Sequence, residues 1–318
     1  MTSTMVSVIM PAYNAESYIE DAIQSILCQS YTNFELIVVD DASIDQTSSI
    51  VQRLDDHRIH YHRNDHNMGV AATLNVAVEM ANGQYLARMD ADDIASSERL
   101  RIQVEYLDNH PDVGVCGTGV FLYDGIRDYK TRLFSSSTYQ IAVDLLFGSA
   151  LAHPTVMMRR TLFTNLGVKY DADYYGCEDY RLWTQLITNT AFHNISEPLL
   201  HYRKHNNQIT ANPSDRNRLL IRKIRADYCE FIGRKLNSNE EDLLDLISKG
   251  QRTFSDEEKQ QVYTLFLDLI PALSALCGHR SQVKEMLSQI FFSFQDTRII
   301  DYRRLSTCRT IAHRVITR

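Results

Sequence analysis

The sequence has 318 residues, of which 44% are hydrophobic and 23% charged, so it is a folded globular protein and not a disordered chain. The 33 basic and 40 acidic side chains give a net charge of −7, which argues against general nucleic-acid binding. The six cysteines show no metal-type spacing and indicate buried thiols of a reducing cytoplasm. We expect neither a signal peptide nor a membrane span, because no apolar run approaches the ~20 residues needed.

Strands and helices are predicted to alternate through the first third of the chain. Apolar runs and amphipathic patterns indicate them. The expected strands cover residues 6–10, 34–39, 59–62 and 84–89, and the expected helices cover residues 14–29, 45–54 and 70–80. We expect Pro11 to end the first strand and Asn14 to cap the first helix. This alternation predicts an α/β fold with a doubly wound, mostly parallel sheet, whose ligands lie beyond the carboxyl ends of the strands.

Aspartates follow two of the predicted strands. Asp40 and Asp41 end the second strand, and Asp90, Asp92 and Asp93 end the fourth. Carboxylates this close raise one another's pKa, and a bound Mg²⁺ or Mn²⁺ would offset their repulsion. A solvated acidic turn that caps the next helix is the simpler interpretation of a single D-x-D. Two acidic strand ends at one edge of the sheet favour a metal-dependent site.

The charges also indicate the kind of ligand. Carboxylates would repel a free diphosphate, so the divalent ion is expected to bridge them to phosphate oxygens. An aspartate after the second strand could accept hydrogen bonds from a ribose or a base, and Tyr13 could stack on a base. Neither a P-loop nor a G-x-G-x-x-G motif at the first turn is present. Gly114, Gly117 and Gly119 lie in strand-like sequence and are interpreted as strand glycines.

Four blocks of the sequence resemble the family 2 glycosyltransferases. In chain order they are VSVIMPAYNAESYIEDAIQSILCQSY, FELIVVDDASIDQT, NMGVAATLN and GQYLARMDADD, and they cover most of residues 6–93. The resemblance implies an inverting enzyme of the GT-A fold that uses a nucleotide-diphosphate sugar. It also implies that Pro11, Ala12 and Tyr13 begin the nucleotide pocket. Asn67 lies in a loop that resembles a nucleotide-contacting loop, although a plain loop role is equally open.

The resemblance extends to the two acidic strand ends. Asp40 and Asp41 occupy the base- and ribose-binding positions of the family, and which of them contacts the base is left open. Asp90, Ala91 and Asp92 form the D-x-D segment expected to contact the nucleotide sugar. Asp92 is the expected direct ligand of Mn²⁺ or Mg²⁺, with Asp90 beside it.

The segments after the acidic turn lead toward the expected acceptor side. Residues 97–109 predict a helix, residues 113–123 a strand, and residues 124–138 a polar, mobile loop near the acceptor. The block of residues 153–155 has two interpretations. In the family such a block often lines the acceptor side, and the alternative is the start of an ordinary strand.

A second acidic motif begins a predicted helix. Glu178 and Asp179 precede Leu182 and Trp183, which mark the buried face of that helix. Acidic residues in a first turn are favoured by the helix dipole alone. The E-D-x-x-L-W pattern nevertheless resembles the general-base motif of the family, which implies that Asp179 takes the proton of the acceptor hydroxyl. Glu178 would then contact the acceptor or tune the base.

The segment HYRKH matches the Y-R-x-H block of the family. The resemblance implies that His205 completes the metal shell, with His201 as the weaker alternative. Arg203 is expected to offset the charge of the departing diphosphate. The alternative for Arg203 and Lys204 is a solvated basic loop.

The sequence divides into two expected parts. Residues 1–212 are the expected GT-A glycosyltransferase domain, and residues 213–318 are an expected helical appendage. Helical patterns cover residues 219–233 and 240–249, and a later one is expected to break at Pro271. The resemblance does not reach this region.

The end of the chain is rich in arginine. Residues 301–318 hold five arginines and a single acid, and they follow an apolar stretch. One interpretation is contact with an anionic membrane surface that carries a lipid-linked acceptor, so that the cytoplasmic protein binds the inner membrane peripherally. The other is an appendage that packs on the catalytic domain or on a second subunit. The oligomeric state is left open.

The sequence therefore predicts an inverting, metal-dependent glycosyltransferase of the hexosyltransferase class. We expect transfer of a sugar from a nucleotide-diphosphate donor, UDP by family default, to a glycan hydroxyl in bacterial surface-polysaccharide synthesis. One alternative is a sugar nucleotidyltransferase, for which the expected phosphate loop is absent. Another is a non-catalytic sugar-nucleotide binder, against which Asp90, Asp92, Asp179 and His205 together argue.

Overall fold

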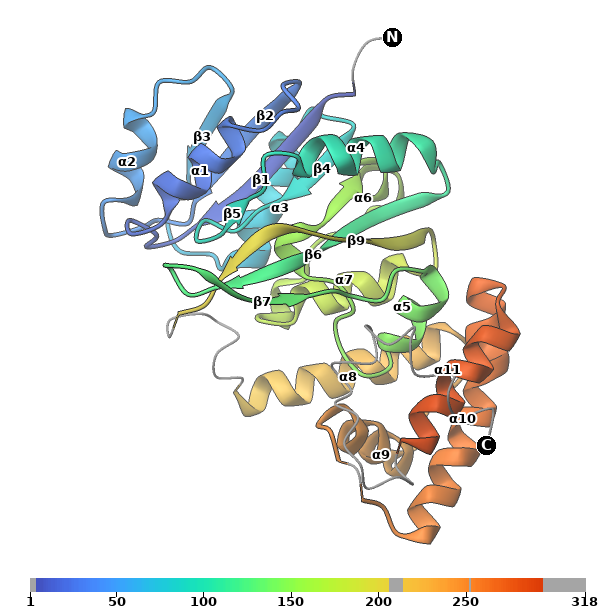
Figure 1. The fold of residues 1–318 in the computed structure, drawn as a ribbon. Helices are drawn as coiled ribbons and strands as arrows, with labels where there is room; N and C mark the ends of the chain where they lie inside the picture. Colours follow the sequence, from blue (N-terminus) through green and yellow to red (C-terminus); the bar gives the residue numbers. More distant parts are fainter. Residues whose placement is uncertain (1–3, 206–213, 252, 294–318) are drawn as a thin grey trace.

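The computed structural model describes residues 4–205, 214–251 and 253–293, built around one nine-stranded sheet (Figure 1). The strand order is β3-β2-β1-β4-β8-β6-β9-β5, and β7 pairs with β6 off this path. The strands are β1 (Val6–Ala12), β2 (Phe34–Asp40), β3 (Ile59–Arg63), β4 (Tyr85–Arg88), β5 (Ile94–Ala95), β6 (Val113–Tyr123), β7 (Asp128–Arg132), β8 (Met157–Arg159) and β9 (Ala191–Arg203). The first four are parallel, whereas β8 is antiparallel to β4 and β6.

Helices cover both faces of the sheet. They are α1 (Ile19–Leu27), α2 (Thr47–Arg53), α3 (Val70–Met80), α4 (Arg99–Asn109), α5 (Thr138–Asp144), α6 (Thr161–Leu166), α7 (Glu178–Leu186), α8 (Asp215–Phe231), α9 (Ser238–Ser248), α10 (Asp256–Cys277) and α11 (Arg280–Phe292). Alternation along β1 explains the two faces: Val8 and Met10 join the core under α1, α2 and α4, while Ile9 joins the core under α3 and α7. The predicted α/β fold class is confirmed.

The C-terminal helices share the second of these cores. Buried side chains of α8 to α11 belong to the same apolar cluster as those of α5 and α7. Figure 1 shows α8 below α7, α10 and α11 near α5, and α9 farther out beside α8 and α10. Tyr228 of α8 donates to the carbonyl of Ala142 in α5 at 2.9 Å. Arg181 of α7 pairs with Asp227 of α8 at 2.8 Å. The helical appendage therefore packs on the sheet domain, while the expected boundary at 212/213 lies outside the described residues.

One described helix, α10, is long and apolar enough by length and composition to cross a membrane. The expectation that no apolar run approaches this length was therefore wrong. A core helix meets the same criteria, and α10 buries Val262, Leu265, Leu269 and Leu273 in the shared core. The arginine-rich residues 301–318 lie outside the described residues.

Two predictions for the first turn were wrong. Strand β1 continues through Pro11 to Ala12. The backbone of Ile9 bonds toward β4, so that of residue 11 faces the same side, where pairing with β4 has already ended and the missing N–H of Pro11 costs no ladder hydrogen bond. Asn14 does not cap α1, which begins at Ile19. With φ 48°, Asn14 instead donates its N–H to Ser43 Oγ at 2.9 Å and so joins the loops after β1 and β2.

The later elements confirm some predictions and correct others. Strand β6 contains the three strand glycines, and a Cβ at Gly117 would lie 2.2 Å from Asn194 Oδ1 of β9. The expected mobile loop at 124–138 instead contains β7, which forms a hairpin with β6. Pro271 lies inside α10 and does not end it.

The shared core predicts that the C-terminal helices and the sheet unfold together. Leu269→Ala removes a fully buried side chain of α10 and should lower the free energy of unfolding by about 2–5 kcal/mol. The single tryptophan, Trp183 in α7, reports the transition by fluorescence in urea. Leu267→Ala, at a side chain that is 44% exposed, is the matched control and should change stability little. A Trp183 transition unaffected by Leu269→Ala would show independent unfolding.

Candidate functional site

Three aspartates form a compact acidic turn after β4. One carboxylate oxygen from each of Asp90, Asp92 and Asp93 lies within 4.8 Å of the others. Asp93 is 1% exposed, and its Oδ2 is buried with no hydrogen-bond partner among the described residues. Burial and the charges of Asp90 and Asp92 raise the pKa of Asp93 well above its ordinary value. The turn is thus a concentration of negative charge without full compensation.

The end of β9 lies against this turn. Antiparallel pairing of Ile94 with His201 sets residues before Ile94 opposite residues after His201. The N–H of Arg203 donates to Asp93 Oδ1 at 2.8 Å, and Nε of Arg203 donates to the carbonyl of Asp92 at 2.8 Å. The structure therefore brings together the predicted D-x-D and Y-R-x-H segments, which are far apart in the sequence.

His205 contacts the acidic turn directly. Its Nε2 lies 2.8 Å from Asp92 Oδ2, and its ring stacks on Tyr18 with centroids 5.2 Å apart. Its Nδ1 is buried and has no partner in the part of the chain that the structure describes. His201, the weaker candidate, instead contacts Asp128 at 2.8 Å. The structure therefore favours His205 over His201 as the neighbour of Asp92.

These residues fit a hard divalent ion. Carboxylate oxygens in a tight group suit Mg²⁺ or Mn²⁺, and a histidine is a frequent further ligand. The unpartnered Oδ2 of Asp93 and Nδ1 of His205 are buried polar atoms of the kind that a ligand would satisfy. Burial and the charge of Asp90 also raise the pKa of Asp92, which an ion would reverse.

Arg203 is enclosed by aromatic rings and is not a solvated loop residue. Its guanidinium lies 4.8 Å from the ring centroid of Tyr18 and 4.9 Å from that of Tyr123. Its side chain is largely buried. A cation held this way beside the acidic turn can compensate phosphate charge.

The two aspartates after β2 have protein partners. Asp40 is fully buried and accepts hydrogen bonds from the N–H of Ser43 and the hydroxyl of Tyr61, both at 2.8 Å. Asp41 accepts from the N–H groups of Met68 at 2.9 Å and Gly69 at 2.8 Å. Asp41 thus shapes the loop before α3. Their predicted contacts with base and ribose stay predictions.

The other predicted donor residues lie at this same end of the sheet. Pro11 and Ala12 are buried at the end of β1, while Tyr13 is 49% exposed and free to contact a ligand. Asn67 is exposed in the loop that Asp41 holds. Ala91 is buried between the first two aspartates of the turn. Their roles toward a nucleotide stay predictions.

The second acidic pair lies at the first turn of α7, as predicted. Glu178 is buried, and its Oε2 accepts from the N–H of Gly176 at 2.7 Å. Burial and the charge of Asp179 raise the pKa of Glu178 to about 7. Asp179 accepts from the hydroxyl of Ser149 at 3.0 Å, and burial raises its pKa as well. A carboxylate with a raised pKa is suited to take a proton near neutral pH.

His153 supports this region from the core. Its Nε2 lies 3.1 Å from the Tyr170 hydroxyl, and its ring meets Trp183 edge-on with centroids 5.7 Å apart. Burial, followed by the charge of Arg88, lowers the pKa of His153 well below its ordinary value. The block forms a 3-10 turn that leads into β8, which agrees with the interpretation of a strand entry, and its role at the acceptor side stays a prediction.

Sequence reasoning missed three residues of the site. Tyr18 contacts both Arg203 and His205, Ser149 contacts Asp179, and Arg88 pairs with Asp90. Of these three, only Arg88 could have been found from the sequence, since a charged residue inside an apolar strand needs a partner. Burial opposes the charged form of Arg88, but the charge of Asp90 raises its pKa.

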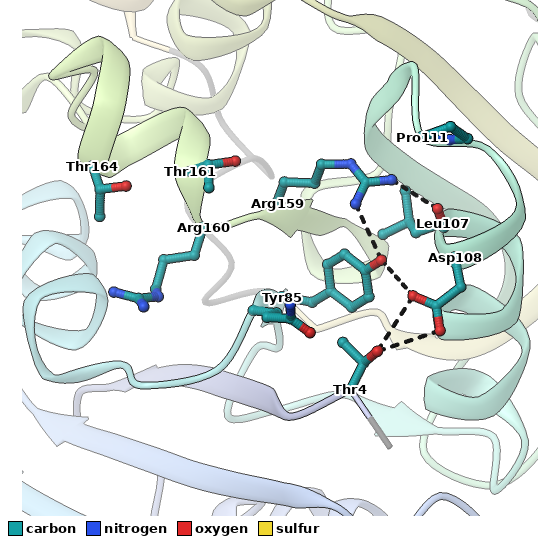
Figure 2. A pocket seen from close by; sticks show the side chains of 10 residues that line it. Thr4, Tyr85, Leu107, Asp108, Pro111, Arg159, Arg160, Thr161 and Thr164 are labelled. Carbon is teal, nitrogen blue, oxygen red and sulfur yellow. Dashed lines mark hydrogen bonds between the residues drawn. The ribbon is translucent and has the colours of Figure 1, made fainter. Parts of the chain in front are cut away.

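A pocket of about 320 Å³ lies at the opposite end of β4 and is separate from the acidic turn (Figure 2). The Tyr85 hydroxyl donates to Asp108 at 2.7 Å, and Arg159 donates to Tyr85 at 3.2 Å. These polar groups satisfy one another, so the pocket shows no chemistry of its own.

Comparison with known proteins places the chain in a family. Residues 7–167 match the family described as Glycosyl transferase family 2. An uncharacterized glycosyltransferase of Haemophilus influenzae is 34% identical over 218 residues, covering 65% of this chain and 68% of the relative. The UDP-Glc:alpha-D-GlcNAc-diphosphoundecaprenol beta-1,3-glucosyltransferase WfaP of Escherichia coli is 28% identical over 214 residues, covering 65% of this chain and 80% of the relative. The crystal structure of S. aureus TarS in complex with UDP-GlcNAc matches with a TM-score of 0.61 and 20% identity, covering 92% and 89% of the two chains.

The chain belongs to glycosyltransferase family 2. Its fold is of the GT-A type, like that of the TarS structure. The protein is therefore a glycosyltransferase, and the resemblance seen in its sequence is confirmed.

The contacts of His205 predict its effect on metal affinity. His205→Ala removes the partner of Asp92 and should weaken Mn²⁺ binding by roughly 10–100-fold. Calorimetric titration with Mn²⁺ in the presence of UDP measures this. His201→Ala, whose side chain contacts Asp128 instead, is the control and should leave the affinity unchanged. Weaker Mn²⁺ binding in His201→Ala, with unchanged binding in His205→Ala, would make His201 the metal ligand.

The raised pKa of Glu178 predicts a pH dependence of stability. The pKa of its carboxyl is 4.5 ordinarily and about 7 when folded, so its stabilising contribution is complete below 4.5 and is lost as pH rises through about 7. Glu178→Gln should therefore make the free energy of unfolding less dependent on pH across that window. Urea unfolding at several pH values tests this, and an unchanged dependence would refute the role of Glu178.

Proposed function

We propose that the chain is an inverting, metal-dependent glycosyltransferase that uses a nucleotide-diphosphate sugar with UDP as its nucleotide. The observation that carries the proposal is the acidic turn with His205 and Arg203 held against it. Carboxylates, an imidazole and a guanidinium together match a diphosphate that is bound through a divalent ion. WfaP, a relative at 28% identity, uses UDP-Glc by its name, which supports UDP.

Each residue has a place in the proposed reaction. Asp92, with Asp90 and His205 beside it, would hold Mn²⁺ or Mg²⁺, which when bound neutralises phosphate charge. Arg203 offsets the charge that develops on the departing diphosphate. Asp179 accepts the proton of the acceptor hydroxyl as that oxygen bonds to the anomeric carbon and the bond to the diphosphate breaks. One displacement inverts the anomeric configuration, so no enzyme nucleophile is required.

The proposed acceptor is a glycan or lipid-linked glycan hydroxyl, in the synthesis of a bacterial surface polysaccharide. The acceptor in the name of WfaP is a sugar on diphosphoundecaprenol, and this supports the proposal. Such an acceptor would place the protein in the cytoplasm, peripherally at the inner membrane.

The role of Asp179 has a direct test. Asp179→Asn removes the basic oxygen while keeping the side-chain shape, so turnover should fall at least about 100-fold. Turnover is measured as UDP release from UDP-sugars with a lipid-linked sugar as acceptor. Calorimetry measures UDP affinity, which should stay within about threefold of the wild type.

Ser149→Ala is the matched control, because it removes only a neutral hydrogen bond to the same carboxylate. It should lower turnover far less than Asp179→Asn. Full turnover in Asp179→Asn would refute the base assignment. Proton NMR of the product should show an inverted anomeric centre, and retention would refute the single displacement.

A further inference from the structure

Arg88 is a buried cation at the end of β4, just before the acidic turn. Its side chain is 5% exposed, and Nη1 forms an ion pair with Oδ2 of Asp90. Its Nε is buried with no hydrogen-bond partner among the described residues. A buried guanidinium needs a charged partner, and Asp90 is the acid in direct contact with it.

The other two aspartates of the turn have different partners. Asp92 contacts His205, and Asp93 accepts the N–H of Arg203. Asp90 alone is therefore shared between the interior cation and the space where the three carboxylates meet. A cation that binds in that space would share Asp90 with Arg88, and the two positive charges would oppose each other.

The same guanidinium also acts on the second acidic pair. Burial raises the pKa values of Glu178 and Asp179, and the positive charge of Arg88 opposes that rise. The charge of Arg88 thus acts on both the acidic turn and the first turn of α7. These two effects explain why a charge is kept in the core, where an apolar residue would cost less.

We propose that Arg88 is a built-in counter-ion that competes with a divalent cation for Asp90, so that the acidic turn binds the cation firmly only together with a nucleotide diphosphate. The inference rests on the proposed function and adds that the cation and the nucleotide bind together. Without a nucleotide, the charge of Arg88 weakens the attraction of the turn for a cation. A diphosphate brings negative charge and oxygen ligands that offset Arg88, so ion and nucleotide favour each other's binding. Arg88 is a positioning residue here, since it acts through Asp90.

Calorimetric titration of the full chain with Mn²⁺ alone, at neutral pH, tests the proposal. Arg88→Met removes the competing charge and should tighten Mn²⁺ binding at least about tenfold, a direction that structural damage would not produce. Arg88→Lys keeps the charge and should stay within about threefold of the wild type. Asp90→Asn leaves Arg88 uncompensated and should weaken binding at least about tenfold.

The double variant Arg88→Met/Asp90→Asn separates charge from ligation. It removes one positive and one negative charge together, so the net charge of the turn is kept and the buried pair is replaced by neutral groups. Because the competing charge and one ligand are both removed, we expect a Mn²⁺ affinity above that of Asp90→Asn and below that of Arg88→Met. If Arg88→Met alone does not fold, comparing the Mn²⁺ affinity of this double variant with that of Asp90→Asn still tests whether Arg88 opposes cation binding.

The control is a second buried arginine outside the site. Arg225 in α8 is 1% exposed and lies 3.7 Å from Asp245. Arg225→Met should lower the melting temperature without changing Mn²⁺ affinity. The proposal is overturned if Arg88→Met binds Mn²⁺ no more tightly than the wild type, or if the double variant binds as weakly as Asp90→Asn.

Adding UDP to the same samples tests whether Mn²⁺ and UDP favour each other's binding. UDP should increase the Mn²⁺ affinity of the wild type by a larger factor than that of Arg88→Met. An equal increase in Mn²⁺ affinity in both proteins would overturn the proposal that Arg88 makes cation binding depend on the nucleotide. Absence of UDP binding and of sugar transfer in the wild type would instead refute the proposed function, and the Mn²⁺-only titrations distinguish the two failures.

Discussion

The hydrogen bond from the N–H of Arg203 to the buried carboxylate of Asp93 joins the two halves of the site. Asp93 follows β4, and Arg203 ends β9, so the bond spans most of the sheet domain in sequence. The short pairing of β5 with β9 sets the register that makes it. Without this register, His205 would not reach Asp92, and the guanidinium of Arg203 would not lie beside the turn.

The site concentrates charge that the fold compensates only in part. Arg88 compensates Asp90 from the interior, and the backbone of Arg203 compensates Asp93. Buried atoms of Asp93 and His205 still have no partner among the described residues. Such polar groups destabilise a folded chain unless a ligand satisfies them, and they are therefore expected where binding occurs. The rigid parallel strands and the core shared with the C-terminal helices supply the stability that offsets this cost.

Much of the fold could be predicted from the sequence because its elements are locally determined. Helix 70–80 and strand 113–123 have the predicted bounds, since each is an 11-residue segment rich in apolar residues. Predictions based on a single proline were wrong at Pro11 and Pro271. At Pro11 the pairing of β1 with β4 has already ended, so the missing N–H of proline costs no hydrogen bond. Where β4 ends relative to β1 is set by the tertiary structure and cannot be read from the local sequence.

For the site, the sequence motifs identified the acidic turn, the E-D pair and His205, but not their partners. The contacts of Tyr18 with Arg203 and of Ser149 with Asp179 join distant segments that no local pattern relates. The ion pair of Arg88 with Asp90 is local, yet the burial of Arg88 follows from α3 and α7, which cover the face of β4 that holds Leu86. The hairpin of β6 and β7 was missed because β7 is entirely exposed and has no apolar alternation.

The central claim is that the acidic turn binds a nucleotide diphosphate through a divalent ion. Calorimetric titration of the purified protein with UDP, GDP, dTDP and CMP, each with Mn²⁺ and again with EDTA, tests it most directly. The account predicts that UDP binds with Mn²⁺, that EDTA abolishes this binding, and that Asp92→Asn has the same effect as EDTA. Equal UDP affinity with Mn²⁺ and with EDTA, or no binding of any nucleotide by the folded protein, would contradict it.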